Sequence, residues 1–416
     1  MSKVTPDIRL AADLFDQLSL RTRKGQGIVR DTYGAGEQAA HDLMRATAES
    51  MALEISVDAI GNLTMTLPGR DRAAPRIIIG SHLDSVPQGG NFDGAAGVIA
   101  GLSAVSGLQA AGVMPAVDVS VMAIRGEESS WFDVSYLGSG GAFGLLDPAC
   151  LQVTRSDTGQ TLEAALLACG FDAGAIREGR RLLDPAQIGA YVEVHIEQGP
   201  TLVELGLPAA VVTAVRGCQR FRNARCLGRY GHSGTVSRLH RHDAVAATVA
   251  FLHHMESVWL CHEQAGDDLV FTAGEFYTDR LLHAPSKIAG ETRFVVDIRS
   301  TSDATMREVA AEARAAAARI GDEYRVRFEL GPTSDSPTAM MDAWLRTRLL
   351  RGLAEPFEMP SGAGHDAATF AKVGVPTAML FVRNENGSHN PDESMDIDDF
   401  SVATQALIQL LLEFPS

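Results

Sequence analysis

The order of the predicted helices and strands changes twice along the chain, and this order limits the possible folds more than any other feature. Up to about Thr213, short buried strands such as Ile77-Ile78-Ile79 alternate with amphipathic helices, which indicates an α/β sandwich around a mixed or parallel sheet. From residue 213 to residue 330 the predicted order is β-α-β-β-α-β, as in ferredoxin-like domains. The first pattern then resumes with a helix near Asp342–Leu353, a strand at Thr377–Val382 and a helix at Ile397–Glu413.

This order predicts one domain inserted into another. We expect residues 1–212 and 331–416 to form the first domain and residues 213–330 to form the second. A chain of 416 residues is long enough to build two hydrophobic cores. Its hydrophobic content of 45% and charged content of 21% are typical of globular proteins.

Charge and hydropathy argue against two classes of partner. The formal net charge of −16 repels nucleic acid and anionic membranes. No apolar segment follows the first residues as in a secretory signal, and the apolar run Ala406–Leu412 is too short to span a bilayer. The five cysteines are scattered and form no CxxC pair. We therefore expect reduced thiols, a cytoplasmic location, and neither nucleic acid nor a membrane as partner.

Five short segments each end a predicted strand with residues that can bind a metal ion. They are Gly80–Pro87, Gly89–Gly94, Arg125–Glu128, Val194–Pro200 and Gly387–Pro391. Imidazole and carboxylate groups together suit zinc, manganese, cobalt or nickel, and the donor atoms alone do not select one of them. A single His-x-Asp or Glu-Glu pair is more often a surface or structural pair. Five such segments at strand ends, where α/β sheets bind ligands, indicate a metal centre.

The same segments resemble the metallopeptidase M20 superfamily, and within it the hydantoinase/carbamoylase family of amidases. That family includes N-carbamoyl-L-amino-acid hydrolases, β-ureidopropionases and allantoate amidohydrolases. The resemblance covers nearly the whole chain, and its most specific motifs are HIEQGP at His195–Pro200, SGAGHDA at Ser361–Ala367 and SHNP at Ser388–Pro391. The first motif distinguishes this branch from ordinary peptidases of the superfamily. The implied fold is an α/β catalytic sandwich with an inserted ferredoxin-like lid and dimerisation domain.

The resemblance implies two divalent metal ions per subunit, with Asp93 as the bridging ligand. His82 and His195 would complete one site, and Glu128 and His389 would complete the other. A bridging carboxylate holds two dications about 3.5 Å apart, which lowers the pKa of the attacking water toward neutrality.

Two further acidic residues have implied roles beside the metal ions. Glu127 would be the general base that moves a proton from water to the leaving nitrogen. Glu127 and Glu128 can do different work because neighbouring side chains on an extended backbone point in opposite directions. Asp84 would orient His82 by accepting its other N–H.

The resemblance also implies a set of substrate contacts, namely Gln198, Arg216, Ser286, Arg299, Gly362 and His365. The guanidinium of Arg299 suits a substrate carboxylate, and a structural ion pair with Asp297 or Glu275 is the alternative. His232 would donate to the oxygen that becomes negative during the reaction, and in the superfamily this histidine often comes from the neighbouring subunit. A purely structural histidine is the alternative there.

The chain departs from the family pattern near the substrate. Ser286 stands where the family usually has asparagine, and its hydroxyl reaches less far. The segments Ser233–Arg238 and Ser129–Phe132 also differ from the usual sequences. These changes lie around the expected cleft and outside the implied metal ligands, so they bear on which substrate is used.

The expected function is metal-dependent cleavage of the carbamoyl C–N bond in an N-carbamoyl-L-amino acid or related ureido acid that carries a carboxylate. The alternatives are an allantoate amidohydrolase, an aminoacylase or dipeptidase, and a binding protein without activity. Gln198 within HIEQGP argues against a peptidase, and the presence of Glu127 beside every implied ligand argues against a protein without activity. We also expect a homodimer and hinges near Ala214–Arg216 and Gly331–Thr333.

Overall fold

The computed structural model describes residues 4–415 and divides the chain into two compact units. Unit 1 consists of Met1–Thr213 and Met341–Ser416, and unit 2 consists of Ala214–Met340. The second boundary lies after Met340 rather than after residue 330. The reason is that β15 (Ser334–Ser336) still pairs with β9 (Gly217–Leu227) in the sheet of unit 2.

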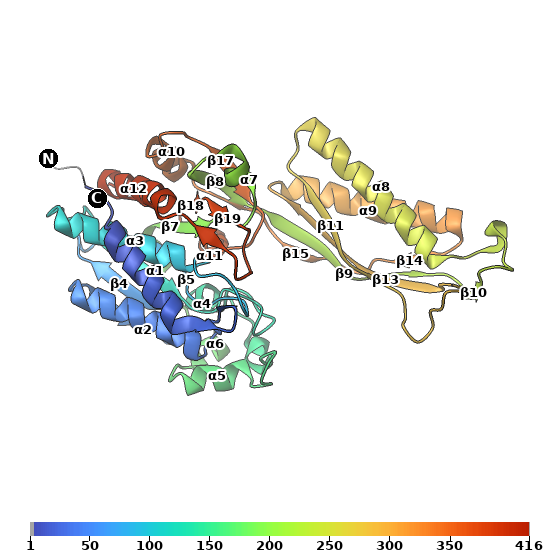
Figure 1. The fold of residues 1–416 in the computed structure, drawn as a ribbon, viewed down its shortest axis with the longest axis horizontal. Helices are drawn as coiled ribbons and strands as arrows, with labels where there is room; N and C mark the ends of the chain where they lie inside the picture. Colours follow the sequence, from blue (N-terminus) through green and yellow to red (C-terminus); the bar gives the residue numbers. More distant parts are fainter. Residues whose placement is uncertain (1–3, 416) are drawn as a thin grey trace. The chain divides into compact units, whose positions relative to one another are not determined.

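Unit 1 is built on a nine-stranded sheet in the order β16-β8-β18-β7-β5-β6-β4-β3, with β17 beside β8 (Figure 1). The strands are β3 (Glu54–Val57), β4 (Leu63–Leu67), β5 (Arg76–His82), β6 (Val119–Ile124), β7 (Ile188–Ile196), β8 (Ala209–Val215), β16 (Ala339–Met340), β17 (Glu358–Ser361) and β18 (Thr377–Val382). The four central strands β6, β5, β7 and β18 run parallel to one another. Their carboxyl ends therefore lie along one edge of the sheet.

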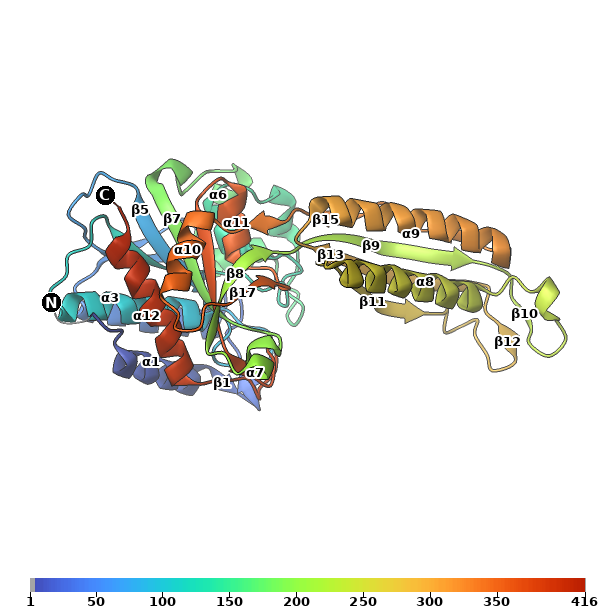
Figure 2. The same ribbon diagram turned by 90° about the horizontal axis from the view of Figure 1, so that it is seen from above.

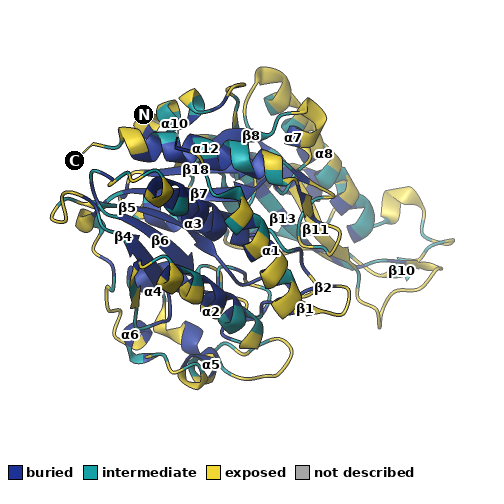
Figure 3. Ribbon diagram, turned by 60° about the vertical axis from the view of Figure 1, so that its left-hand side comes forward, coloured by how far each residue is buried: buried dark blue, intermediate teal, exposed yellow. Residues whose placement is uncertain are grey.

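Helices pack on both faces of this sheet. The larger ones are α1 (Ile8–Thr22), α2 (Ala35–Ser50), α3 (Ala95–Ala110), α10 (Ala343–Arg351), α11 (Asp366–Lys372) and α12 (Ile397–Glu413). Val192 and Val194 of β7 pack in the core that includes α3, whereas Tyr191 stacks on Phe370 of α11 at 3.7 Å between ring centroids. Because alternate residues of β7 face opposite helices, its residues from Ala190 to Ile196 are all buried (Figure 3).

The segment between β6 and β7 forms a smaller part of unit 1 with its own apolar cluster. Its helices are α4 (Leu137–Ala142), α5 (Leu162–Ala168) and α6 (Gly174–Arg177), and the cluster contains Trp131, Phe132 and Leu166 among others. Helix α7 (Thr201–Leu205) follows β7, and two short hairpins complete the unit: β1 (Arg23–Lys24) with β2 (Gly27–Ile28), and β19 (Asn384–Glu385) with β20 (Ser394–Met395).

Unit 2 has the element order β-α-β-β-α-β, which is that of a ferredoxin-like fold (Figure 2). The elements are β9, β10 (Gly231–His232), α8 (Ala244–Ala265), β11 (Val270–Tyr277), β12 (Lys287–Ile288), β13 (Glu291–Ser300), α9 (Asp303–Tyr324), β14 (Arg327–Glu329) and β15. The main sheet has the order β11-β13-β9-β14 and is antiparallel. Helices α8 and α9 share one core with it, and β10 pairs with β12 outside it.

Helix α8 is, by length and hydropathy alone, the one described helix that could cross a membrane. Its Ala247, Phe251 and Met255 are fully buried in the core of unit 2. Its N-terminus is capped by Asp243, which accepts the N–H of Ala246, and Gly266 ends it with a φ of 83°. These features are those of a helix that covers a sheet, so its hydropathy is weak evidence for a membrane span.

Candidate metal centre

The implied metal ligands of unit 1 lie at the shared carboxyl edge of the parallel strands. His82 is the last residue of β5, and His195 is the next-to-last residue of β7. Glu128 follows β6, and His389 lies in the hairpin after β18. Asp93 comes from the loop between β5 and α3. The structure therefore brings together five residues that span more than 300 positions in the sequence.

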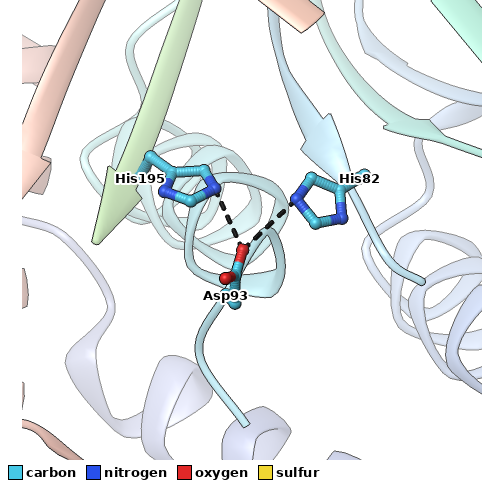
Figure 4. Close-up of side chains that lie close together, drawn as sticks. All are labelled: His82, Asp93 and His195. Atoms are coloured by element: carbon cyan, nitrogen blue, oxygen red, sulfur yellow. Dashed lines mark ion pairs between the residues drawn. The ribbon is translucent and has the colours of Figure 1, made fainter. Parts of the chain in front are cut away.

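Asp93 lies at the centre of this group. Its Oδ1 is 3.4 Å from Nε2 of His82 and 3.2 Å from Nε2 of His195 (Figure 4). Its Oδ2 is 3.4 Å from Nε2 of His389, which in turn lies 3.2 Å from Oε1 of Glu128. Each carboxylate oxygen thus faces a different set of donors, and Asp93 belongs to two of the three groups of described residues that could hold an ion.

The imidazole rings are held so that Nε2 points into the centre. Nδ1 of His82 lies 3.2 Å from Oδ1 of Asp84, and Nδ1 of His195 lies 2.9 Å from the backbone oxygen of Ile196. Gly94 has a φ of 67°, and a Cβ there would lie 2.5 Å from the His82 ring, so the loop can pass this close only with glycine. Histidines that ligate metals commonly carry such a partner on the other nitrogen. The donor set and its orientation therefore fit divalent ions.

Electrostatics reinforce this arrangement. Burial would raise the pKa of Asp93, but hydrogen bonds from His195, His389 and His82 hold that pKa well below its usual range. Burial would lower the pKa of His82, and its contacts with Asp84 and Asp93 raise it well above the usual value. Asp93 is therefore an anion at neutral pH, the form that binds cations.

Asp84 also fixes the segment that carries the two glutamates. It accepts the backbone N–H groups of Glu127 at 3.0 Å and Glu128 at 3.2 Å, and the hydroxyl of Thr32 at 2.6 Å. Oε2 of Glu127 lies 4.0 Å from Nε2 of His82. Burial raises the pKa of Glu127 well above its usual value; His82 opposes this shift and Glu128 adds to it. A carboxyl group with a raised pKa can exchange protons near neutrality.

Of the implied substrate contacts in unit 1, Gln198 lies nearest to the centre. Its Nε2 donates to Oδ2 of Asp93 at 3.0 Å and lies 3.4 Å from Nε2 of His389. His365 is buried, with Nε2 2.8 Å from the hydroxyl of Ser361 and its ring against that of His195 at 4.5 Å between centroids. Gly362 lies in the loop between Ser361 and His365.

The other implied contacts lie in unit 2, and their arginines already have partners. Arg299 pairs with Asp297 at 2.9 Å, the structural alternative considered from the sequence, and Arg216 pairs with Asp268 at 2.5 Å. His232 is exposed on β10 and accepts the N–H of Gly234 at 3.1 Å. The backbone oxygen of Ser286 accepts the N–H of Ser233 at 2.9 Å, so Ser286 and the His232 loop are neighbours.

Two residues around Asp93 were not predicted from the sequence. Arg30 is fully buried and donates to the backbone oxygens of Leu83, Asn91 and Asp93. Glu393 is 7% exposed and accepts the N–H groups of Phe92 and Asp93. The sequence offered one signal for Glu393, namely its position four residues after His389, and none for Arg30.

Known proteins are similar to this chain in fold and in sequence over nearly its full length. The model of peptidase family M20/M25/M40 matches residues 78–413. An N-carbamoyl-L-amino-acid amidohydrolase of Paenarthrobacter aurescens is 31% identical, with 95% of each chain covered. An allantoate amidohydrolase of Escherichia coli is 33% identical, with 87% of this chain and 86% of the relative covered.

Solved structures agree with these sequence matches. The crystal structure of an amidase of the hydantoinase/carbamoylase family from Burkholderia multivorans superposes with a TM-score of 0.89 at 27% identity, covering 99% of this chain and 100% of that one. The resemblance inferred from the motifs is thereby confirmed. With its candidate metal-ligand residues gathered around Asp93 and its family match over residues 78–413, this chain belongs to peptidase family M20/M25/M40.

Proposed function

We propose that this chain hydrolyses the carbamoyl C–N bond of N-carbamoyl-L-amino acids or related ureido acids, with two divalent ions bound around Asp93. Its relatives are amidohydrolases, and the chain is a hydrolase of carbon–nitrogen bonds outside peptides. The observation that carries the proposal is the position of Asp93, whose two oxygens face two separate sets of donors. A carboxylate that bridges two ions needs this arrangement.

The residues around Asp93 have distinct tasks in the proposed reaction. Two bound divalent ions would supply Lewis acidity at the substrate carbonyl and lower the pKa of the attacking water. Glu127 takes a proton from that water and delivers it to the nitrogen of the bond that breaks. Asp84 holds the backbone of Glu127 and the ring of His82, so that both side chains keep their positions during this transfer.

Arg299 and His232 lie too far apart in unit 2 to contact one small substrate together. β13 alone puts roughly 25 Å between Glu291 and Arg299, at about 3.3 Å for each residue of a strand. The β10–β12 pair that carries His232 lies beyond the Glu291 end of β13 (Figure 2). We therefore propose that His232 serves the site of a second copy in a homodimer, with unit 2 as lid and dimerisation domain. Arg299, with Arg216 nearby as a further candidate, would bind the substrate carboxylate.

Allantoate is the second candidate substrate, because an allantoate amidohydrolase is among the relatives. The test is a panel of N-carbamoyl-L-amino acids, β-ureidopropionate, allantoate and an N-acetyl amino acid, with Mn²⁺, Co²⁺, Ni²⁺ and Zn²⁺ supplied separately to the metal-free protein. Carbamoyl cleavage releases ammonia and CO₂ in equal amounts, whereas cleavage of the acetyl compound releases neither. Turnover of the acetyl compound alone would contradict the proposal.

A further inference from the structure

The loop that carries Asp93 has no regular secondary structure to hold it. Residues 83–94 lie between β5 and α3, and within them only Gly89 forms an isolated bridge, to Ile28. The bridging carboxylate must nevertheless stay fixed within a fraction of an ångström if it is to face two sets of donors. Backbone hydrogen bonds hold part of this loop, such as that from Ser85 N–H to the oxygen of Arg30. Side chains from elsewhere in the chain supply further hydrogen bonds around Asp93.

Glu393 accepts hydrogen bonds from the backbone N–H groups of this loop. Its Oε1 accepts the N–H of Phe92 at 2.8 Å and that of Asp93 at 3.1 Å. Its Oε2 lies 2.9 Å from the hydroxyl of Ser388, which also lies 2.5 Å from Oδ2 of Asp93. Glu393 thus ties the Asp93 loop to the hairpin that carries His389.

Arg30 donates hydrogen bonds to the backbone carbonyl groups of this loop. Its Nε donates to Leu83 O at 2.6 Å, its Nη1 to Asn91 O at 3.3 Å and its Nη2 to Asp93 O at 3.0 Å. Leu83 directly follows His82, so one guanidinium joins the His82 loop to the Asp93 loop. Within residues 4–415 no carboxylate lies within ion-pair distance of Arg30. A buried guanidinium that hydrogen-bonds only to backbone oxygens is costly unless nearby anions stabilise its charge. Burial lowers the pKa of Arg30, and the negative charge of Glu393 opposes this shift.

The close approach of Glu393 to the loop depends on Gly90. A Cβ on Gly90 would lie 2.2 Å from both Cδ and Oε1 of Glu393. Such a contact is far shorter than the van der Waals distance, so alanine at position 90 would displace the Glu393 carboxylate while both charges remain present.

We propose that Arg30 and Glu393 are a pair of positioning residues that set the metal affinity of the Asp93 centre. Both bind the same loop, Arg30 by its carbonyl groups and Glu393 by its N–H groups, and the two residues lie far apart in the sequence. This inference rests on the proposed metal site. Residues that hold metal ligands in place typically change metal affinity about 10–100-fold when they are replaced.

The test measures Mn²⁺ binding to the metal-free protein by calorimetry at 25 °C, together with the visible spectrum of the Co²⁺-loaded protein. We expect Arg30→Lys, Glu393→Gln and Gly90→Ala each to raise the dissociation constant about tenfold or more. The Co²⁺ bands should shift, because the ligand geometry changes. The matched controls Arg23→Gln and Glu385→Gln alter exposed residues on β1 and β19 and should bind as the wild type does.

A role in folding alone would lower the thermal midpoint of the metal-free protein and leave the Mn²⁺ affinity and the Co²⁺ spectrum of the folded protein unchanged. That result for the folded variants among Arg30→Lys, Glu393→Gln and Gly90→Ala would overturn the inference. If the wild type binds Mn²⁺ and Asp93→Asn does not, the proposed metal site stands. The three variants then decide whether Arg30 and Glu393 set its affinity. A wild type that bound no divalent ion would overturn the proposed function, and this inference with it.

Discussion

The two units hold their functional residues in different ways. In unit 1, the side chains of His82, His195 and Asp93 are at most 5% exposed, and partners outside the centre fix both rings. In unit 2, Arg299 lies on the main antiparallel sheet and is 29% exposed, and His232 is exposed on β10, outside that sheet. Under the proposed function, the difference teaches that the reaction would depend on a largely buried centre, whereas substrate recognition would depend on more exposed groups that can change partner.

The comparison predicts that the largest catalytic loss comes from unit 1. Glu127→Gln should lower kcat about 10²–10⁴-fold, because the general base is lost while the side chain keeps its shape. Metal content, measured by inductively coupled plasma mass spectrometry, should stay near that of the wild type. Glu128→Gln is the matched neighbour and should instead lower metal occupancy. Near-normal turnover in Glu127→Gln would remove this residue from the mechanism.

The next prediction tests whether unit 2 acts on a second copy of the chain. His232→Ala should lower kcat about 10²–10³-fold, the usual effect of losing one donor to a developing oxyanion. Mixing this variant with Glu127→Gln should restore about a quarter of the wild-type activity. Half of the randomly mixed dimers are then hybrid, and each hybrid has one complete site. No recovery after confirmed subunit exchange would mean that His232 acts in its own subunit or has no role.

A smaller effect is expected at Arg299, the proposed contact for the substrate carboxylate. Arg299→Lys keeps the positive charge and loses the forked pair of donors, so KM should rise about tenfold with little change in kcat. A carboxamide analogue of the substrate should show no such difference. Arg293→Lys lies on the same strand in an exposed ion pair with Glu291 and serves as the control. Equal KM values for both variants would assign Arg299 to structure alone.

The last prediction concerns stability instead of activity, and it separates buried from surface carboxylates. Burial and Glu193 raise the pKa of Asp366 to about 8, so the folded state holds its proton between pH 4 and pH 8. The stability from this group is therefore lost as the pH rises to 8. Asp366→Asn should remove about 3 kcal/mol of the stability loss that the wild type shows between pH 6 and pH 9.

The measurement uses urea unfolding of the metal-free protein in a Trp259→Phe background. Trp131 and Trp344 then report unit 1 alone, which matters because a chain with two units does not unfold in one step. The control is Glu54→Gln in unit 1, because the side-chain hydrogen bond from Arg72 lowers the pKa of this exposed carboxylate. The stability from Glu54 is lost only as the pH falls through its folded pKa, so this variant should show the same change in stability as the wild type from pH 6 to 9.

The sequence predicted the fold well where elements are long and periodic. The strand at Thr377–Val382 and the helix at Ile397–Glu413 have the predicted bounds, and the order of unit 2 is the predicted one. Strands β8 and β17, helix α11 and the small helices between β6 and β7 were not predicted. Each is short or, like β8, an apolar run next to turn residues, and periodicity alone does not identify such runs.

The candidate site shows a similar division. The segments that carry His82, Asp93 and His389 could be recognised as candidate metal-binding segments from their residue types at the ends of strands, and the family resemblance then implied these three residues as ligands. Arg30 and Glu393 could not, because a charged residue in a sequence is most often on the surface. Only the folded chain shows that both are buried and aimed at the backbone of one loop.

The position of β18 in the sheet has a consequence for the order of folding during synthesis. β18 lies between β7 and β8, yet it follows all of unit 2 in the chain. Unit 2 is continuous, so it can fold as soon as its residues leave the ribosome. The sheet of unit 1 stays split until residues 377–382 arrive, and its unpaired strand edges need protection from other chains for that interval. Unit 2 can therefore be complete on the ribosome before the candidate metal centre of unit 1 can form.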